Sequence, residues 1–134
     1  MAVITIIDEA GRSLLFHQES KVVHHVIRGP LHGNDFRDLL ARGAECMERY
    51  GACKWLSDDR ESGVIAPEDY EWGDRVWAPR VIRAGFRYWS IAVPSNAVGS
   101  MQMRRFAEEY RQRGVTVEVF SNVDTALAWL KAAA

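Results

Sequence analysis

The sequence predicts an α/β domain with a mixed β-sheet flanked by helices, in the element order βββαβαβαβα. Two observations predict it. Three strand-like segments come first with no helix between them, and the later strand-like segments alternate with amphipathic helical segments. Strands joined by short turns pair antiparallel, whereas strands joined through helices pair parallel, so the sheet is expected to be mixed. A length of 134 residues corresponds to a single domain over residues 1–134.

The opening β-rich region is predicted from alternating and β-branched residues, which give strands at Val3–Ile7, Arg12–Gln18 and Lys21–Ile27. Glu19-Ser20 separates the last two strands and is short enough for a hairpin turn. In such a hairpin, residue 17 pairs with residue 22 and residue 15 with residue 24. Gly29-Pro30 ends the region.

The first helix is expected to begin at Asn34, whose side chain can cap it, and to end at Gly51, in the position that glycine favours after a helix. Its apolar positions fall at three- and four-residue steps, at Phe36, Leu39, Leu40, Gly43, Met47 and Tyr50. The next strand is Cys53–Ser57. This strand is interpreted as a buried, central strand of the sheet that stops in a cluster of charge.

The second half of the chain alternates helices with strands. Pro67 fits the first turn of a helix, where its missing N–H costs nothing, and Pro79 is expected to break or kink that helix before Gly85. The remaining elements are strand Tyr88–Val93, a helix over about Val98–Arg113, strand Val115–Phe120, and a last helix opened by Ser121 with Asp124 and running through Leu130.

Composition excludes several classes of function. The formal net charge is −1, from 17 basic and 18 acidic residues, which argues against a nucleic-acid partner or a charged membrane surface. The opening run has neither the basic leader of a signal peptide nor the length of a membrane span. Cys46 and Cys53 are interpreted as small buried hydrophobes in a reducing compartment. A cytoplasmic protein is expected.

The histidines raise the hypothesis of a metal site. Hairpin pairing makes His17 and His24 diagonal neighbours on one sheet face and turns His25 to the other face. Two imidazoles could bind zinc if a carboxylate joined them, but the local sequence supplies none. A half-exposed polar sheet face explains the pair equally well. Neither a metal nor a cofactor is predicted.

A cluster of charged residues, Asp58, Asp59 and Arg60, follows the central strand, where α/β domains present functional groups. The carboxylates could act as general bases or bind a cation, and the arginine could hold an anion. The structural interpretation is an ion-pair cluster that orders the following loop. No complete catalytic set accompanies these residues.

The helix that begins at Pro67 carries Tyr70, Trp72 and Trp77, which cannot all face the same way at that spacing. At least one of them is therefore expected to be partly exposed or to line a groove. Aromatic anchors dominate both protein interfaces and apolar pockets, so this helix is a candidate binding surface. The alternative is that most of the tryptophans belong to the core.

The order of elements and several local motifs resemble a known family. The motifs are Lys54-Trp55-Leu56-x-Asp58-x-Arg60, Ile65-x-Pro67-Glu68-Asp69-x-x-Trp72, Pro79, Ile82-x-x-Gly85 and Phe120-x-x-x-x-x-Ala126-x-x-Trp129-Leu130. Together they resemble the small bacterial proteins with STAS domains, which are similar to the sporulation anti-sigma-factor antagonist SpoIIAA and are also described as STAS/CRAL-TRIO-like.

The resemblance implies a STAS-like mixed sheet, a homodimer, and action through binding. In the antagonists a serine after the central strand is phosphorylated, and the matching region here runs from Asp58 to Gly63. Ser62 is therefore a candidate for phosphorylation, and Ser57 is the other serine in this part of the chain. The lipid-carrier side of the superfamily implies an apolar groove.

Three functions follow, in order of preference. The first is a non-enzymatic binding or regulatory module for a protein partner or a small ligand. Its surface is predicted to contain Asp58, Asp59, Arg60, Ser62, Tyr70, Trp72 and Trp77. The second is a carrier of a small apolar or lipid-like ligand with tryptophan walls, and the third is an enzyme that uses Asp58 or Asp59 as a base.

Overall fold

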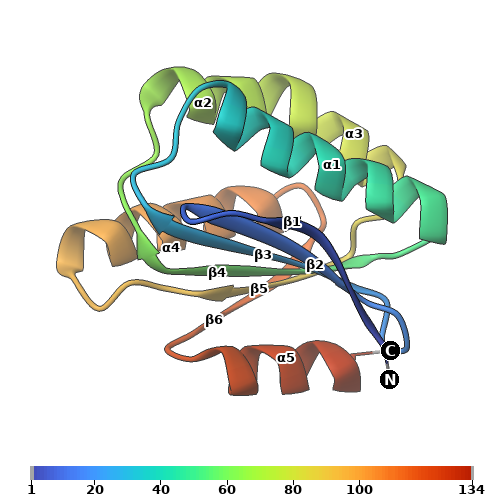
Figure 1. The fold of residues 1–134 in the computed structure, drawn as a ribbon. Coiled ribbons are helices and arrows are strands. Elements are labelled where there is room, and N and C mark those ends of the chain that lie inside the picture. The colour runs from blue at the N-terminus through green and yellow to red at the C-terminus, as the bar shows by residue number, and fades with distance from the viewer. Residues whose placement is uncertain (1, 134) are drawn as a thin grey trace.

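The structure, a computed structural model that describes residues 2–133, contains one six-stranded sheet (Figure 1). The strands lie in chain order, with β1 to β3 antiparallel and β3 to β6 parallel, which confirms the predicted mixed sheet. Their bounds are β1 Val3–Asp8, β2 Arg12–His17, β3 Val22–Gly29, β4 Lys54–Ser62, β5 Tyr88–Ala92 and β6 Thr116–Phe120.

Helices cover both faces of the sheet. Their bounds are α1 Asn34–Tyr50, α2 Pro67–Trp72, η1 Gly73–Trp77, α3 Ala78–Arg83, α4 Ala97–Arg111 and α5 Val123–Ala132. All except α5 pack on one face, which we call the broad face, and α5 alone covers the other, the α5 face (Figure 1). Within residues 2–133 no helix is both long enough and apolar enough to cross a membrane.

The two faces have separate cores. The larger core lies between the broad face and its helices and includes Leu39, Met47 and Trp55, each fully buried. The smaller one joins Leu56 on the sheet to Leu130 on α5. Because side chains alternate along a strand, successive residues of β4 contribute to opposite cores.

Helix α1 approaches the sheet closely at Gly43, which the sequence placed among its apolar positions. A Cβ atom at this glycine would lie only 2.1 Å from the Cη2 atom of Trp55. The missing side chain therefore makes room for the indole. The helix ends as predicted, with Gly51 in the left-handed conformation at φ 66°.

Helix beginnings differ slightly from the predictions. Gly33 is the N-cap residue of α1, and Asn34 is the first helical residue. The final helix is capped by Asn122, whose Oδ1 accepts the Thr125 N–H at 2.9 Å, and not by Ser121. These shifts of one residue do not change which helix faces become buried.

Two predictions about the middle of the chain are wrong. Strand β4 does not end at Ser57 but continues to Ser62, because β3 also continues to Gly29 and gives it a parallel partner. The charged residues 58–60 are therefore strand residues and not a loop. Pro79 does not interrupt its helix: α2, η1 and α3 follow one another directly, with a π-helical turn just before the proline.

Candidate functional site

A cavity of about 80 Å³ lies on the broad face, between the sheet and the segments α2, η1 and α4. Its lining combines many aromatic residues with a few polar ones. The lining residues are His25, Ile27, Phe36, Leu40, Trp55, Ser57, Asp59, Ile65, Asp69, Tyr70, Gly73, Asp74, Trp77, Trp89, Met103, Phe106 and Tyr110. Concave, mainly apolar sites with a few convergent polar groups are typical of small-molecule binding.

The floor of the cavity contains a buried hydrogen-bond chain built on β3 and β4. The Trp55 indole N–H donates to His25 Nδ1 at 3.0 Å, and His25 Nε2 lies 2.9 Å from Asp59 Oδ1. An indole nitrogen can only donate, so His25 Nδ1 must accept. The ring proton of His25 therefore lies on Nε2, from which it is donated to the Asp59 carboxylate.

Ser57 lies between these residues on the same face of β4. It is the cross-strand partner of His25 in the β3–β4 register, and it is fully buried. Its Oγ accepts the Trp89 indole N–H at 2.8 Å. Two tryptophans thus donate hydrogen bonds into the floor, which fixes the orientation of their rings as cavity walls.

The π-helical turn η1 shapes the wall opposite the sheet. The Ala78 N–H bonds the carbonyl oxygen of Gly73, five residues earlier, which widens the helix at this point. Trp77, at the end of the turn, is buried and donates its indole N–H to the Leu40 carbonyl of α1 at 2.8 Å. Gly73 also lines the cavity, and a Cβ atom there would meet nothing within 4 Å. The turn therefore contributes one large side chain, Trp77, to the cavity wall and leaves open space beside Gly73.

The mouth of the cavity is formed by half-buried aromatic residues of α2 and α4. Tyr70 stacks on Phe106 with 5.1 Å between ring centroids. The Tyr70 hydroxyl donates to the Glu109 carboxylate, and this bond raises the pKa of Tyr70 to about 12. The phenol therefore stays neutral at physiological pH and ties the two helices together across the mouth.

Three aspartates line the cavity, and two of them have arginine partners. Asp69 accepts the Gly33 N–H at 2.9 Å and the Arg37 Nε–H at 3.2 Å, and Asp74 pairs with Arg113. Asp59 has only the His25 ring as a partner among residues 2–133. In the part of the chain that the structure describes, no lysine or arginine lines the cavity.

Comparison with known proteins addresses the fold. No protein-family model matches the chain, and no curated protein matches it. Among solved structures it is similar to an uncharacterized protein of the DUF3478 family from Shewanella loihica PV-4, which has a SpoIIAA-like fold. The TM-score is 0.55 at 15% sequence identity, and the match covers 96% of this chain and 92% of that one. The fold of this chain is SpoIIAA-like. The resemblance stated from the sequence is thus confirmed for the fold.

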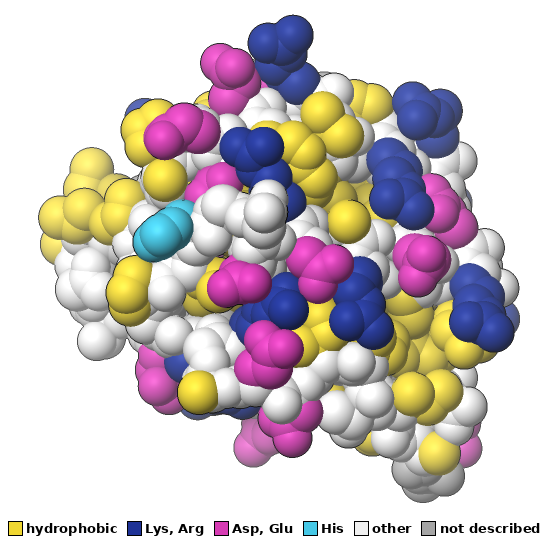
Figure 2. Space-filling model, turned by 45° about the horizontal axis from the view of Figure 1, so that its top comes forward, with side chains coloured by type: hydrophobic (Ala, Val, Ile, Leu, Met, Phe, Trp, Pro, Cys, Tyr) yellow, Lys and Arg dark blue, Asp and Glu magenta, His cyan; other side chains and the backbone are white. Residues whose placement is uncertain are grey.

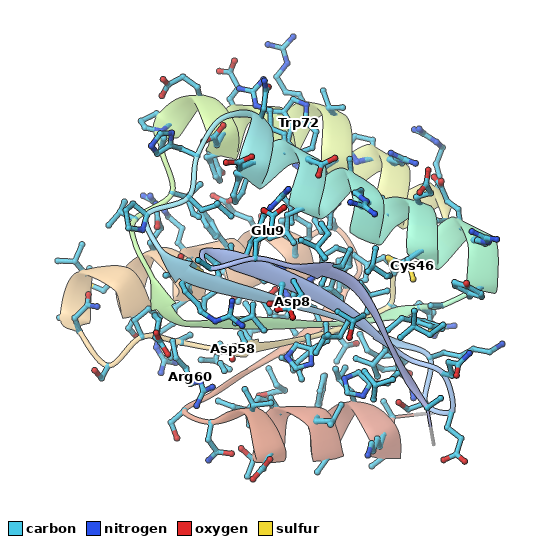
Figure 3. The ribbon with its side chains drawn as sticks, in the orientation of Figure 1. Asp8, Glu9, Cys46, Asp58, Arg60 and Trp72 are labelled. Atoms are coloured by element: carbon cyan, nitrogen blue, oxygen red, sulfur yellow. The ribbon has the colours of Figure 1, made fainter. Side chains whose placement is uncertain are left out.

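The SpoIIAA-like sheet divides the predicted site residues between its two faces. Asp59, Tyr70 and Trp77 line the cavity on the broad face. Asp58 and Arg60 lie on the α5 face, where Arg60 donates to both carboxylate oxygens of Asp58 at 2.8 and 2.9 Å (Figure 3). Residues 58–60 lie in strand β4 and not in a loop. Because side chains alternate along a strand, Asp59 points to one face and its two neighbours point to the other.

The two remaining predicted residues also lie apart from the cavity. Trp72, at the end of α2, is half-buried against the edge of the larger core, with the Arg37 guanidinium 5.8 Å from its ring (Figure 3). Ser62 ends β4, and its hydroxyl donates to the Gly63 carbonyl at 2.8 Å. The predicted residues therefore do not form one continuous surface. On the face of the molecule that Figure 2 shows, basic and acidic side chains are interspersed with apolar ones.

The histidine pair has the predicted geometry. His17 Nε2 and His24 Nδ1 lie 3.1 Å apart on the α5 face, and His25 points to the broad face. Burial lowers the pKa of His24 to about 4 and also lowers the pKa of His17. No group of three or more metal-ligating side chains occurs within residues 2–133.

Sequence reasoning did not assign the floor residues His25, Ser57 and Trp89 to a site. A signal was available for two of them. Strand alternation turns His25 away from the other histidines, and it puts Ser57 on the same face as Asp59. The sequence does not show that β3 pairs with β4, and this pairing is what puts His25 beside Ser57.

Proposed function

We propose that this protein is a binding module without catalytic activity, and that its ligand is a small molecule held in the broad-face cavity. One observation carries the proposal. Seven aromatic side chains surround the cavity above a floor of hydrogen-bonded polar groups: Phe36, Trp55, Tyr70, Trp77, Trp89, Phe106 and Tyr110. Such a lining offers a large contact area to a ligand at low cost in side-chain ordering, because packing and indole hydrogen bonds already hold the rings.

The size of the cavity supports a small ligand. Its volume of about 80 Å³ is roughly half that of an engineered 150 Å³ cavity that holds benzene. It can therefore enclose a short polar group and the edge of one ring, while the rest of a ligand contacts Tyr70 and Phe106 at the mouth. A complete lipid chain does not fit without movement of the helices.

The hydrogen bonds of the floor favour binding over nucleophilic catalysis. A serine nucleophile needs its hydroxyl beside a free base, but Ser57 Oγ accepts a bond from Trp89, and both nitrogens of His25 are engaged. The division of Asp58 and Asp59 between the two faces also argues against a carboxylate pair acting on one substrate. The homodimer, the cytoplasmic location and the phosphorylation of Ser62 stay predictions.

Nuclear magnetic resonance of the indole N–H groups tests the proposal. The five tryptophans give five indole signals, and single Trp→Phe variants assign them. Millimolar benzyl alcohol, used as the probe, is expected to shift the signals of Trp55, Trp77 and Trp89, which line the cavity. Trp129 packs on the α5 face against Phe120 and serves as the internal control, so its signal is expected to stay in place.

Two outcomes of this titration would contradict the proposed site. If saturating benzyl alcohol left all three cavity indoles unmoved, or if the largest shift belonged to Trp129, the proposed site would be wrong. Native mass spectrometry of freshly purified protein adds a second readout, since a tightly held natural ligand appears as an extra non-covalent mass.

A further inference from the structure

We propose that the cavity is selective for an organic cation: a primary ammonium group, carried on an apolar body about the size of one ring, that binds against Asp59. This inference rests on the proposed ligand-binding function and specifies the chemistry of the ligand. It depends on Asp59, the one buried carboxylate among residues 2–133 that has no arginine or lysine partner.

Asp59 is only 4% exposed, yet its carboxylate is incompletely paired. Oδ1 accepts the N–H of His25. Within residues 2–133 no group donates a hydrogen bond to Oδ2, and this oxygen is not among the fully buried atoms without a partner, so it keeps some accessible surface. A buried carboxylate without a counter-charge is costly. An ammonium group in the cavity would supply both the missing charge and the missing hydrogen bond.

Three other aspartates, on β4 or at the cavity wall, each form an ion pair with an arginine. Asp58, the preceding residue on the strand, has Arg60, and Asp69 has Arg37. Asp74, at the cavity wall, has Arg113. Among residues 2–133, Asp59 is the one of these four with no arginine partner, and the cavity that it lines contains no lysine or arginine. Asp59 is therefore the member of this group whose carboxylate can take a cationic ligand as its partner.

The aromatic walls favour the same sign of charge. Ring faces carry partial negative charge and attract a cation placed within about 6 Å of their centroids. Trp55 and Trp77 meet edge to face, with centroids 5.1 Å apart, and Trp89 meets Tyr110 in the same manner at 4.8 Å. An anion would meet this lining and Asp59 unfavourably. We therefore expect affinity to fall in the order cation, neutral molecule, anion.

The floor provides a second acceptor for the ammonium group. Ser57 Oγ uses one lone pair for the Trp89 N–H, and its other lone pair can accept a further bond. Ser57 and Asp59 are two residues apart on one strand and share its face. A primary ammonium group has three N–H donors, so it can satisfy both, which a tertiary or quaternary ammonium cannot.

Titration of the indole signals with matched probes tests this inference. Benzylamine, benzyl alcohol and benzoate have similar size and differ in charge at neutral pH. Wild-type protein is expected to bind benzylamine at least about tenfold more tightly than benzyl alcohol, a difference of about 1.4 kcal/mol, and to bind benzoate more weakly than either.

Two conservative variants locate the charge that is responsible. Asp59→Asn keeps the shape of the side chain and removes its charge, so the preference for benzylamine over benzyl alcohol is expected to fall to about onefold. Asp58→Asn is the matched control, because it makes the same change one residue away on the α5 face, where Arg60 occupies the carboxylate. It is expected to leave the preference unchanged.

The outcomes separate the two proposals. Equal affinity of the wild-type protein for benzylamine and benzyl alcohol would overturn the cation inference and leave the ligand-binding function standing. Failure of every probe to move the cavity indoles would overturn the function itself. The inference also fails if Asp58→Asn abolishes the preference as fully as Asp59→Asn. If Asp59→Asn does not fold, the affinities of the wild-type protein for benzylamine and benzyl alcohol still test whether the cavity prefers a cation.

Discussion

Asp58 and Asp59 are neighbours on one strand, and their surroundings differ as much as the two faces of the sheet do. Asp58, on the α5 face, is held by Arg60, and these hydrogen bonds outweigh burial and lower its pKa. Asp59, on the broad face, is bonded by His25 and borders a cavity. One strand thus serves a structural ion pair on one face and a candidate binding site on the other.

The covering elements explain the difference. On the α5 face a single helix meets the sheet, and the side chains there pair among themselves, as His17 does with His24 and Trp129 with Tyr88. On the broad face α1, the α2–η1–α3 segment and α4 converge, and large rings fill the space between them incompletely. The mainly aromatic cavity lies where the three segments of the broad face meet, whereas α5 alone packs on the other face through a small apolar core.

The comparison predicts that tryptophans on the two faces differ in their contribution to stability. Trp55 is fully buried and donates a hydrogen bond to His25, so Trp55→Ala is expected to lower the free energy of unfolding by about 3–5 kcal/mol. Trp129 is half-buried on α5, and Trp129→Ala is expected to cost only about 1–2 kcal/mol. Urea denaturation at neutral pH measures both.

This prediction is sensitive to the quality of the packing around each ring. Equal losses for the two variants would mean that the broad-face core is loosely packed around Trp55. The cavity would then be a packing defect and not a preformed site. If Trp129→Ala lowered the free energy of unfolding more than Trp55→Ala did, the main core would lie on the α5 face and not on the broad face.

The sequence was sufficient for the sheet and insufficient for the site, and β4 shows why. Alternation correctly placed His17 and His24 together and His25 opposite, because a period of two is a property of the strand itself. The end of β4 was missed because Asp58, Asp59 and Arg60 have the composition of a loop. They stay in a strand because β3 continues beside them and because Arg60 and His25, in the folded protein, bond the two carboxylates.

The cavity itself could not be predicted, since it depends on contacts between distant elements. The π-helical turn before Pro79 determines where Trp77 and Gly73 face, and no local signal distinguishes it from a kink. Trp72 and Trp77 were both candidates. Their different burial follows from the position of the helix on α1, where the Leu40 carbonyl accepts the Trp77 indole.

The α5 face is expected to make stability depend on pH through His24. Burial lowers the pKa of His24 to about 4, against about 6.5 in the unfolded chain. As pH falls, the unfolded chain takes up this proton first. Stability is therefore lost from about pH 6.5 down to about pH 4, by about 3 kcal/mol over the interval and about 2 kcal/mol between pH 7 and pH 5.

Unfolding by urea at a series of pH values, with His24→Asn beside the wild type, measures this effect. The variant is expected to lose most of the slope between pH 7 and pH 5, whereas the loss from protonation of Asp58 begins only below about pH 4. His32→Asn is the control, because His32 is exposed. An unchanged slope in His24→Asn would show that the buried ring does not carry the pH dependence.

Two helical glycines on the broad face are expected to respond to alanine with opposite signs. At Gly43 an added Cβ atom would lie 2.1 Å from Trp55, so Gly43→Ala is expected to destabilise the protein by about 1–3 kcal/mol. At Gly73 the added atom meets nothing within 4 Å, and Gly73→Ala is expected to stabilise the helix by up to about 1 kcal/mol. Thermal unfolding distinguishes the two signs.

A larger residue at Gly73 then separates stability from binding. Because this glycine is buried and lines the cavity, the side chain of Gly73→Leu must enter the empty space. The variant is expected to stay folded and to lose the shifts that benzyl alcohol produces in the indole signals of Trp55 and Trp89. If Gly73→Leu bound the probe as the wild type does, the broad face would be closed by packing like the α5 face, and the ligand would have to bind elsewhere.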